Sequence, residues 1–205
     1  MAVDPDLVPM HRRTIEFDVY DAGESVRVVG RLRDLRPWAE DAARTIVHDM
    51  ELDLEVRRSD LVILSAKATM HTFPHAECPQ IEDAFAQMVG LSIARGYTKA
   101  VSGRFVGVLG CSHLEHLARA LGPAVIQAVA SGYSKQFADG VLPPPAARPR
   151  SAPWLKDTCH IWAEGGIGEQ KIALGGFPSD GQSYPVPSLE ELLRRRQLSE
   201  RSEGP

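Results

Sequence analysis

The chain has 205 residues, of which 43% are hydrophobic and 24% are charged, and its formal net charge is −4 at pH 7. This length suits one domain with a hydrophobic core and an appendage, and it argues against two full domains. The weakly acidic charge, with neither sign concentrated over residues 1–140, argues against nucleic acid as a partner.

No segment of the sequence indicates a membrane or secretion. The chain has no run of about eighteen apolar residues, and residues 1–10 lack the basic and apolar regions of a signal peptide. We therefore expect a cytoplasmic protein without a membrane partner. The three cysteines, Cys78, Cys111 and Cys159, are an odd number in a chain with sufficient core. Free thiols are expected here, and not a disulfide framework.

Four runs of apolar residues predict four β-strands in succession, and hence an antiparallel meander. The runs are 13–20, 26–32, 48–56 and 61–68. The third run alternates most cleanly, with apolar residues on the buried side and the acidic residues from Asp49 onward facing water. By parity, His48 points inward with the apolar set.

Two helices are expected after these strands. Cys78-Pro79 precedes an apolar stripe of helical period, and because Pro79 suits the first helical position, Cys78 is the predicted N-cap. A glycine-dotted segment, 96–110, separates this helix from the next. There Ser112 and Glu115 have the spacing of a capping box at the start of a helix that reaches about residue 132.

The expected fold is therefore α+β: a four-stranded antiparallel meander followed by two helices packed on one face. We predict that this domain spans 1–140 and that a Pro-rich linker, 141–153, leads into a C-terminal extension, 141–205 as a whole. Residues 154–177 are expected to add a short strand or two, with Cys159 packing back onto the core. The tail after residue 188 is expected to form two helical turns.

Cys78 and Cys111 both fall at predicted helix starts, where unpaired N–H groups and the helix dipole stabilise an anion. A thiol in that environment is reactive or binds a metal. Alternatively, each cysteine is a small apolar residue filling a tight turn.

His48 and His113 complete the candidate cluster. Two cysteines and two histidines suit either a tetrahedral zinc site or a Cys/His nucleophile pair, although no CxxC or HxxxH spacing is present. The competing interpretations are that His48 only hydrogen-bonds within the core and that His113 is solvated. His71 and His75, just before Cys78, are weaker candidates.

A second group of residues suggests anion binding. His11 and Arg13 share one face of the first strand and are candidates to bind a carboxylate or phosphate, or else are rim residues. The segment from Gly107 to Ser112 has the outline of an oxyanion site, in which backbone N–H groups meet negative charge, but it is not a P-loop.

The sequence resembles the bacterial family catalogued as domain of unknown function 2889, over roughly residues 10–165. The resemblance rests on His11-Arg12-Arg13, Val47-His48-Asp49-Met50, Cys78-Pro79, Gly110-Cys111-Ser112-His113-Leu114, Gln127 and Asp157-Thr158-Cys159. It implies an acyl-CoA thioesterase of aromatic catabolism, with a hydroxylated or methoxylated benzoyl-CoA as substrate. The order of His48, Cys78 and Cys111 is also similar to the ligand order of iron–sulfur scaffold proteins, which implies that the three residues converge.

Two functions follow as expectations. The first is a thioesterase without metal or cofactor, acting through His48, Cys78, Cys111 and His113, with His11, Arg13 and Ser112 binding substrate and with a homodimer or higher homo-oligomer as the assembly. In it, either Cys111 attacks the thioester or a histidine activates water. The second is a metal or iron–sulfur carrier that uses the same cysteines and histidines.

Overall fold

The computed structural model describes residues 4, 6–138, 156–175 and 185–202. By its internal contacts the chain separates into two units, 1–129 and 130–205, and each is described by itself. The expected linker 141–153, and with it the expected boundary at residue 140, lies outside the described residues.

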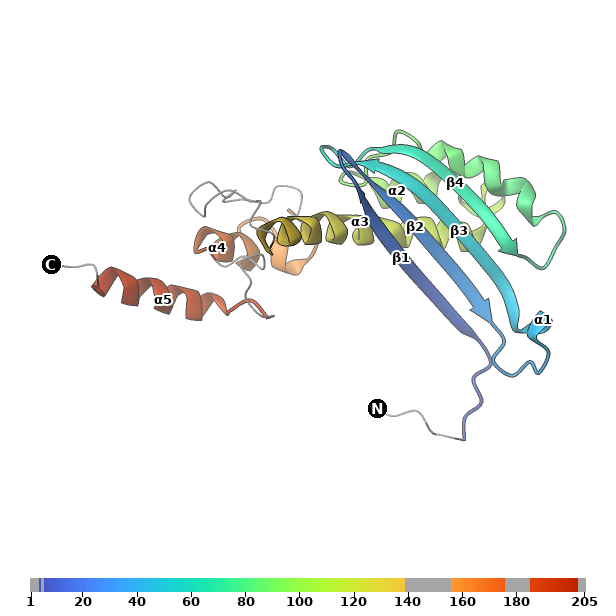
Figure 1. Cartoon of the computed structure of the whole chain (residues 1–205), viewed down its shortest axis with the longest axis horizontal. Helices are drawn as coiled ribbons and strands as arrows, with labels where there is room; N and C mark the ends of the chain where they lie inside the picture. The colour runs from blue at the N-terminus through green and yellow to red at the C-terminus, as the bar shows by residue number, and fades with distance from the viewer. Residues whose placement is uncertain (1–3, 5, 139–155, 176–184, 203–205) are drawn as a thin grey trace. The chain divides into compact units, whose positions relative to one another are not determined.

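The first unit is built on a four-stranded antiparallel sheet in the order β1-β2-β3-β4 (Figure 1). The strands are β1 Arg12–Ala22, β2 Ser25–Leu35, β3 Ile46–Arg57 and β4 Ile63–Thr72. The first three strands extend the predicted runs at both ends, β4 begins two residues later and ends four residues later than predicted, and the predicted α+β meander is confirmed. Arg12 pairs with Leu35, and Leu35 pairs with Ile46, so β1 begins, β2 ends and β3 begins at the same end of the sheet.

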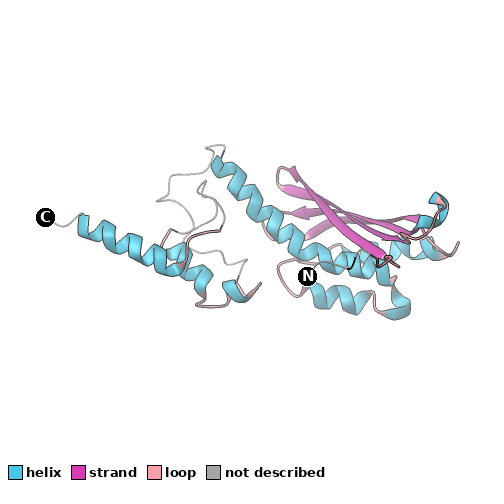
Figure 2. Ribbon diagram, turned by 90° about the horizontal axis from the view of Figure 1, so that it is seen from below, coloured by secondary structure: helices cyan, strands magenta, loops and turns pink. Residues whose placement is uncertain are grey.

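Helices cover one face of this sheet (Figure 2). The helical elements of the unit are α1 Ala42–Thr45, the 3-10 helices η1 Cys78–Met88 and η2 Gly107–Leu109, α2 Tyr97–Arg104, and α3 Ser112–Ala138, which crosses the unit boundary. Fully buried residues alternate along β2 and β3, and they pack with Phe85 of η1, Val101 of α2 and Leu117 of α3 in one core. The alternation that predicts the strands therefore also places their even-numbered residues under the helices.

The helix α2 lies in the segment expected to be irregular. Its glycines conceal the pattern, but Tyr97 and Val101, one helical turn apart, are buried, and the Tyr97 hydroxyl donates to the Ala118 carbonyl at 2.8 Å. Burial raises the pKa of this phenol. Tertiary packing thus overrides the weak helix propensity of the segment.

Both predicted N-caps are displaced by one residue. The cap of η1 is Glu77, so Cys78 is the first helical residue. At α3 the first helical hydrogen bond runs from the Glu115 amide to the Cys111 carbonyl at 2.8 Å, which makes Cys111 the N-cap. The Glu115 carboxylate accepts a hydrogen bond from the Ser102 hydroxyl at 3.2 Å. The predicted capping box is therefore wrong, because with Cys111 as the N-cap Glu115 lies one position too late for it.

The side chain of Asp49 was expected to face water, but it is buried. It is only 5% exposed, because the Arg31 guanidinium forms a two-point hydrogen bond with it across the outer face of the sheet, at 2.6 and 2.5 Å.

The described part of the second unit is helical. It contains η5 His160–Trp162, α4 Ile167–Ala173 and α5 Leu189–Ser202. The strands expected in 154–177 are absent from the described residues of this unit. Cys159 is exposed, so the prediction that it packs onto the core is wrong. The tail forms a longer helix than the two turns expected, since α5 has 14 residues. Within the described residues, no helix is both long enough and apolar enough to span a membrane.

Candidate Asp-His-Cys active site

A buried carboxylate, Asp34, organises the candidate site. It lies on the even-numbered, core-facing side of β2, near the end of the strand, and is 1% exposed. Arg13, its register partner on β1, donates from Nε to Oδ1 and from a terminal nitrogen to Oδ2, both at 2.7 Å. His11 Nε2 lies 3.1 Å from Oδ1. This two-point pairing fixes the orientation of the carboxylate.

The same contacts keep Asp34 ionised. Burial by itself raises the pKa of this carboxyl, but the hydrogen bonds and charge of Arg13 act against it, helped by His48 and His11, and the pKa falls to about 2. Asp34 is therefore an anion throughout the neutral range and is available to orient neighbouring imidazoles.

Two histidines meet this carboxylate at Oδ2. His48 is the register partner of Asp34 on β3, and its Nδ1 lies 3.0 Å from Oδ2. His113, from the first turn of α3, has Nε2 3.4 Å from the same oxygen. The two rings lie 3.7 Å apart between centroids. Because Asp34 is ionised, each histidine donates its N–H towards it, which leaves His48 Nε2 and His113 Nδ1 as acceptors.

Cys111 lies beside the second of these acceptors. Its Sγ is 3.8 Å from His113 Nδ1, and its position as N-cap sets the thiol at the positive end of the 27-residue helix α3. Burial lowers the pKa of His113, and electrostatic interaction with the adjacent His48 lowers it further. His113 is thus neutral near pH 7 and can accept the thiol proton. Cys111, His113 and Asp34 form a continuous chain of contacts with the arrangement of a nucleophile, a base and an orienting acid.

Asp34, His48 and His113 also offer three ligand atoms within 4.8 Å of one another, the only such group among the described residues. Two imidazoles and a carboxylate suit a divalent transition metal. However, both oxygens of Asp34 already accept hydrogen bonds from Arg13, whose charge opposes a second cation. The donor types therefore fit a metal, but the electrostatics of the site do not favour one.

The structure brings together most, but not all, of the predicted site residues. His48, Cys111 and His113 converge as described, and His11 and Arg13 bind a carboxylate, that of the chain's own Asp34. Ser112 is exposed at the start of α3.

The other predicted residues are Cys78, His71 and His75. Cys78, like Cys111, is partly buried against the hydrophobic core, and within the described residues neither cysteine is in the metal-capable group. His71 lies 3.3 Å from Glu51, and His75 is exposed.

Asp34 itself was not predicted from the sequence. The signal was available, because Asp34 follows Val28 and Leu32 at even positions and so occupies the buried face. A carboxylate on a buried face requires cationic partners, and Arg13 stands opposite in the antiparallel register.

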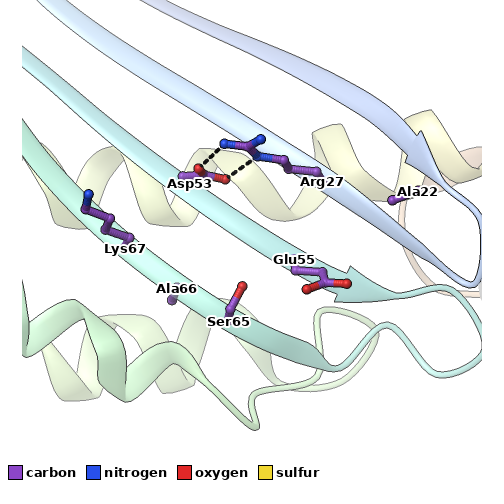
Figure 3. Close-up of a pocket in the computed structure, with 7 residues that line it drawn as sticks. All are labelled: Ala22, Arg27, Asp53, Glu55, Ser65, Ala66 and Lys67. Atoms are coloured by element: carbon purple, nitrogen blue, oxygen red, sulfur yellow. Dashed lines mark hydrogen bonds and ion pairs between the residues drawn. The ribbon is translucent and has the colours of Figure 1, made fainter.

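A separate hollow of about 370 Å³ lies elsewhere on the sheet (Figure 3). Its lining residues are Ala22, Arg27, Asp53, Glu55, Ser65, Ala66 and Lys67. Arg27 and Asp53 are odd-numbered residues of the outer face, near the β1–β2 hairpin, and they pair with each other through two hydrogen bonds. This hollow lies on the opposite face and towards the opposite end of the sheet from Asp34, and it is open and mixed in charge.

The model of a family described as "Protein of unknown function (DUF2889)" matches residues 11–127. No curated protein and no solved structure matches the chain. The matched stretch is more than half of the chain and contains Asp34, His48, Cys111 and His113, whereas Asp157 to Cys159 lie beyond it.

Proposed function

The chain belongs to the DUF2889 family, and we propose that it is a thioesterase that cleaves an acyl-CoA with Cys111 as nucleophile. The observation that carries this proposal is the uninterrupted line of contacts from Cys111 Sγ to His113 Nδ1 at 3.8 Å, and from His113 Nε2 to Asp34 at 3.4 Å. A thiol with a base and an oriented acid behind it is suited to acyl transfer.

In the first step His113 Nδ1 takes the Cys111 proton, and the thiolate attacks the thioester carbonyl. The bond from the acyl carbon to Sγ forms as the bond to the sulfur of coenzyme A breaks. The leaving thiolate takes the proton from His113, so that free coenzyme A and an acyl-Cys111 result. Asp34 stabilises the transient imidazolium, and its low pKa keeps it from taking the proton itself.

In the second step water must attack the acyl-cysteine. His48 holds Asp34 through Nδ1, which leaves Nε2 to accept a proton from that water. Hydroxide adds to the acyl carbon, the Cys111 thiolate departs, and it takes the proton back from His48. The carboxylic acid product then leaves. His113 thus acts as the base in the first half-reaction and His48 in the second, and Asp34 contacts both.

The start of α3 supplies a second contribution. The N–H groups of Ser112, His113 and Leu114 precede the first helical hydrogen bond, which begins at Glu115. They lie next to Cys111, where the carbonyl oxygen of a bound thioester becomes negative. One such donor contributes on the order of 3–4 kcal/mol to an oxyanion transition state.

The acyl group of the substrate is proposed to be aromatic. The aromatic acyl group is chosen from the sequence resemblance, because the description of the matched family assigns no activity. One feature supports an apolar acyl group: the turn directly before Cys111 exposes Val106, Val108 and Leu109, at 60%, 98% and 58%. Exposed apolar side chains beside a nucleophile suit contact with an apolar substrate.

A metal carrier is the second candidate, because Asp34, His48 and His113 can offer three ligands. In that case purified protein binds Zn²⁺ or Fe²⁺ near one equivalent, and the His48→Ala variant loses it. The Arg13 pairing of Asp34 favours the thioesterase over the carrier.

The proposal is tested with a panel of acyl-CoA esters, measuring the release of free thiol. We expect hydrolysis of at least one aromatic acyl-CoA, and a rate lowered about 10²- to 10⁴-fold in His113→Ala. His71→Ala is the matched control, because His71 pairs with a different carboxylate, Glu51. Equal rates in both variants would remove His113 from the reaction, and no turnover of any ester would refute the thioesterase.

A further inference from the structure

A short loop joins β2 to α1 at the end of the sheet where Asp34 lies, and hydrogen bonds hold it in place on both sides. The Arg36 amide donates to the Thr45 carbonyl at 2.8 Å, and the Trp38 indole N–H donates to the Met10 carbonyl at 3.1 Å. The loop therefore lies between the start of β1 and the end of α1, and its first residue, Arg36, follows Asp34 by two positions in sequence.

Three arginines gather around this loop. Arg36 begins it, Arg12 begins the neighbouring strand as the register partner of Leu35, and Arg44 precedes Thr45. All three are exposed. In the described part of the chain none of their guanidinium groups forms an ion pair or hydrogen bond, whereas Arg13, Arg27, Arg31 and Arg33 all pair with carboxylates.

Acidic residues do not cancel this group. Glu40 and Asp41 follow in the same loop, but the three arginines outnumber them, and Asp41 takes part in an interaction of its own. Unpaired arginines fixed near one another by backbone hydrogen bonds are suited to phosphate groups, because each guanidinium can donate two parallel hydrogen bonds.

Trp38 adds an aromatic surface to the same loop. Its side chain is 55% exposed although its N–H is hydrogen-bonded, so the ring is held while much of it faces solvent. An exposed, oriented indole beside arginines is the combination that binds a base by stacking and its phosphates by charge.

We propose that Arg12, Arg36, Arg44 and Trp38 bind the nucleotide part of coenzyme A, its adenine on Trp38 and its phosphates on the arginines. This inference rests on the proposed thioesterase function, which supplies coenzyme A as the ligand. The long pantetheine arm then joins this loop to Cys111. The loop fixes the part of the substrate that all acyl-CoA esters share, and the site at Cys111 selects the acyl group.

Direct binding tests the proposal without any need for turnover. The full chain is titrated with free coenzyme A and with pantetheine, which lacks the phosphates and adenine, and binding is followed by calorimetry. The double variant Arg36→Gln/Arg44→Gln is expected to bind coenzyme A about 10- to 100-fold more weakly, as expected for lost charge-assisted hydrogen bonds. Trp38→Ala is expected to lose about tenfold. Neither is expected to change the affinity for pantetheine.

Arg27→Gln is the matched control, since this exposed arginine lies at the other end of the sheet and is expected to leave coenzyme A affinity unchanged. Unchanged affinity in the folded double variant would overturn the site, as would equal losses for pantetheine or tighter binding of a short RNA. Arginine-dependent binding of coenzyme A without hydrolysis of any ester would support this site and refute the thioesterase. Hydrolysis of an ester by the wild type, together with unchanged coenzyme A binding in the double variant, would support the thioesterase and refute this site.

Discussion

Replacing Asp34 by Asn removes the charge on which four side chains converge: His11, Arg13, His48 and His113. The pKa of Asp34 falls from an ordinary 3.8 to about 2, which at ~1.4 kcal/mol per pKa unit corresponds to about 2 kcal/mol of stability at pH 7. The amide also turns N–H donors towards the donors of Arg13. We therefore expect Asp34→Asn to lower the free energy of unfolding by about 2–4 kcal/mol.

The stability difference between the wild type and Asp34→Asn is expected to depend on pH. Because the folded-state pKa is depressed, the contribution of Asp34 is complete above pH 3.8 and is lost as the pH falls towards 2. Urea unfolding of the wild type and of Asp34→Asn, followed by circular dichroism, should show a full difference at pH 7 and a shrinking one below pH 4.

Asp53→Asn is the matched control for the same measurement. Asp53 also accepts two hydrogen bonds from an arginine, Arg27, but that pair lies on the open outer face of the sheet, so little change is expected. A loss in Asp34→Asn no larger than in this control, or one that persists unchanged to pH 2, would refute the account of the buried carboxylate.

Three further predictions concern the surroundings of Cys111. Gly110→Ala is expected to cost about 1–3 kcal/mol, because its Cβ would lie 2.5 Å from a backbone carbonyl oxygen, whereas Gly103→Ala in α2 meets nothing within 4 Å and should be neutral or stabilising in thermal unfolding. His48→Ala should lower the rate of thioester hydrolysis about 10²- to 10⁴-fold while changing the free energy of unfolding by only about 1 kcal/mol. An unchanged rate would show that His48 is not a base in the reaction. Alkylation near pH 6.5 should label Cys111 before Cys159, although Cys159 is the more exposed, since His113 Nδ1 lies 3.8 Å from the Cys111 thiol and can accept its proton. Faster labelling of Cys159 would contradict this.

The strands were predictable because period-two alternation is a local property of the sequence. The same parity correctly turned His48 towards the helices, where it meets His113. Register was also within reach, since a short hairpin at Gly23 fixes which residue of β2 lies opposite Arg13. Asp34 was missed because a charged residue at the end of a strand was read by its type and not by its face.

Other features depend on tertiary contacts that no local pattern reports. Helix α2 forms in a glycine-rich segment because Tyr97 reaches across to the carbonyl of Ala118. Glu115 has the spacing of a capping residue but instead accepts a hydrogen bond from Ser102. Cys78 and Cys111 both lie partly buried against the core at helix starts, and it is the fold that brings the thiol of Cys111 to 3.8 Å from His113 Nδ1.

The central claim is that Cys111, and not Cys78, forms a covalent acyl intermediate backed by His113 and Asp34. The most direct measurement compares the release of coenzyme A from an aromatic acyl-CoA by the wild type, Cys111→Ala and Cys78→Ala. We expect Cys111→Ala to lose about 10³-fold or more, and Cys78→Ala to stay within about threefold of the wild type. Full turnover by Cys111→Ala would contradict the account.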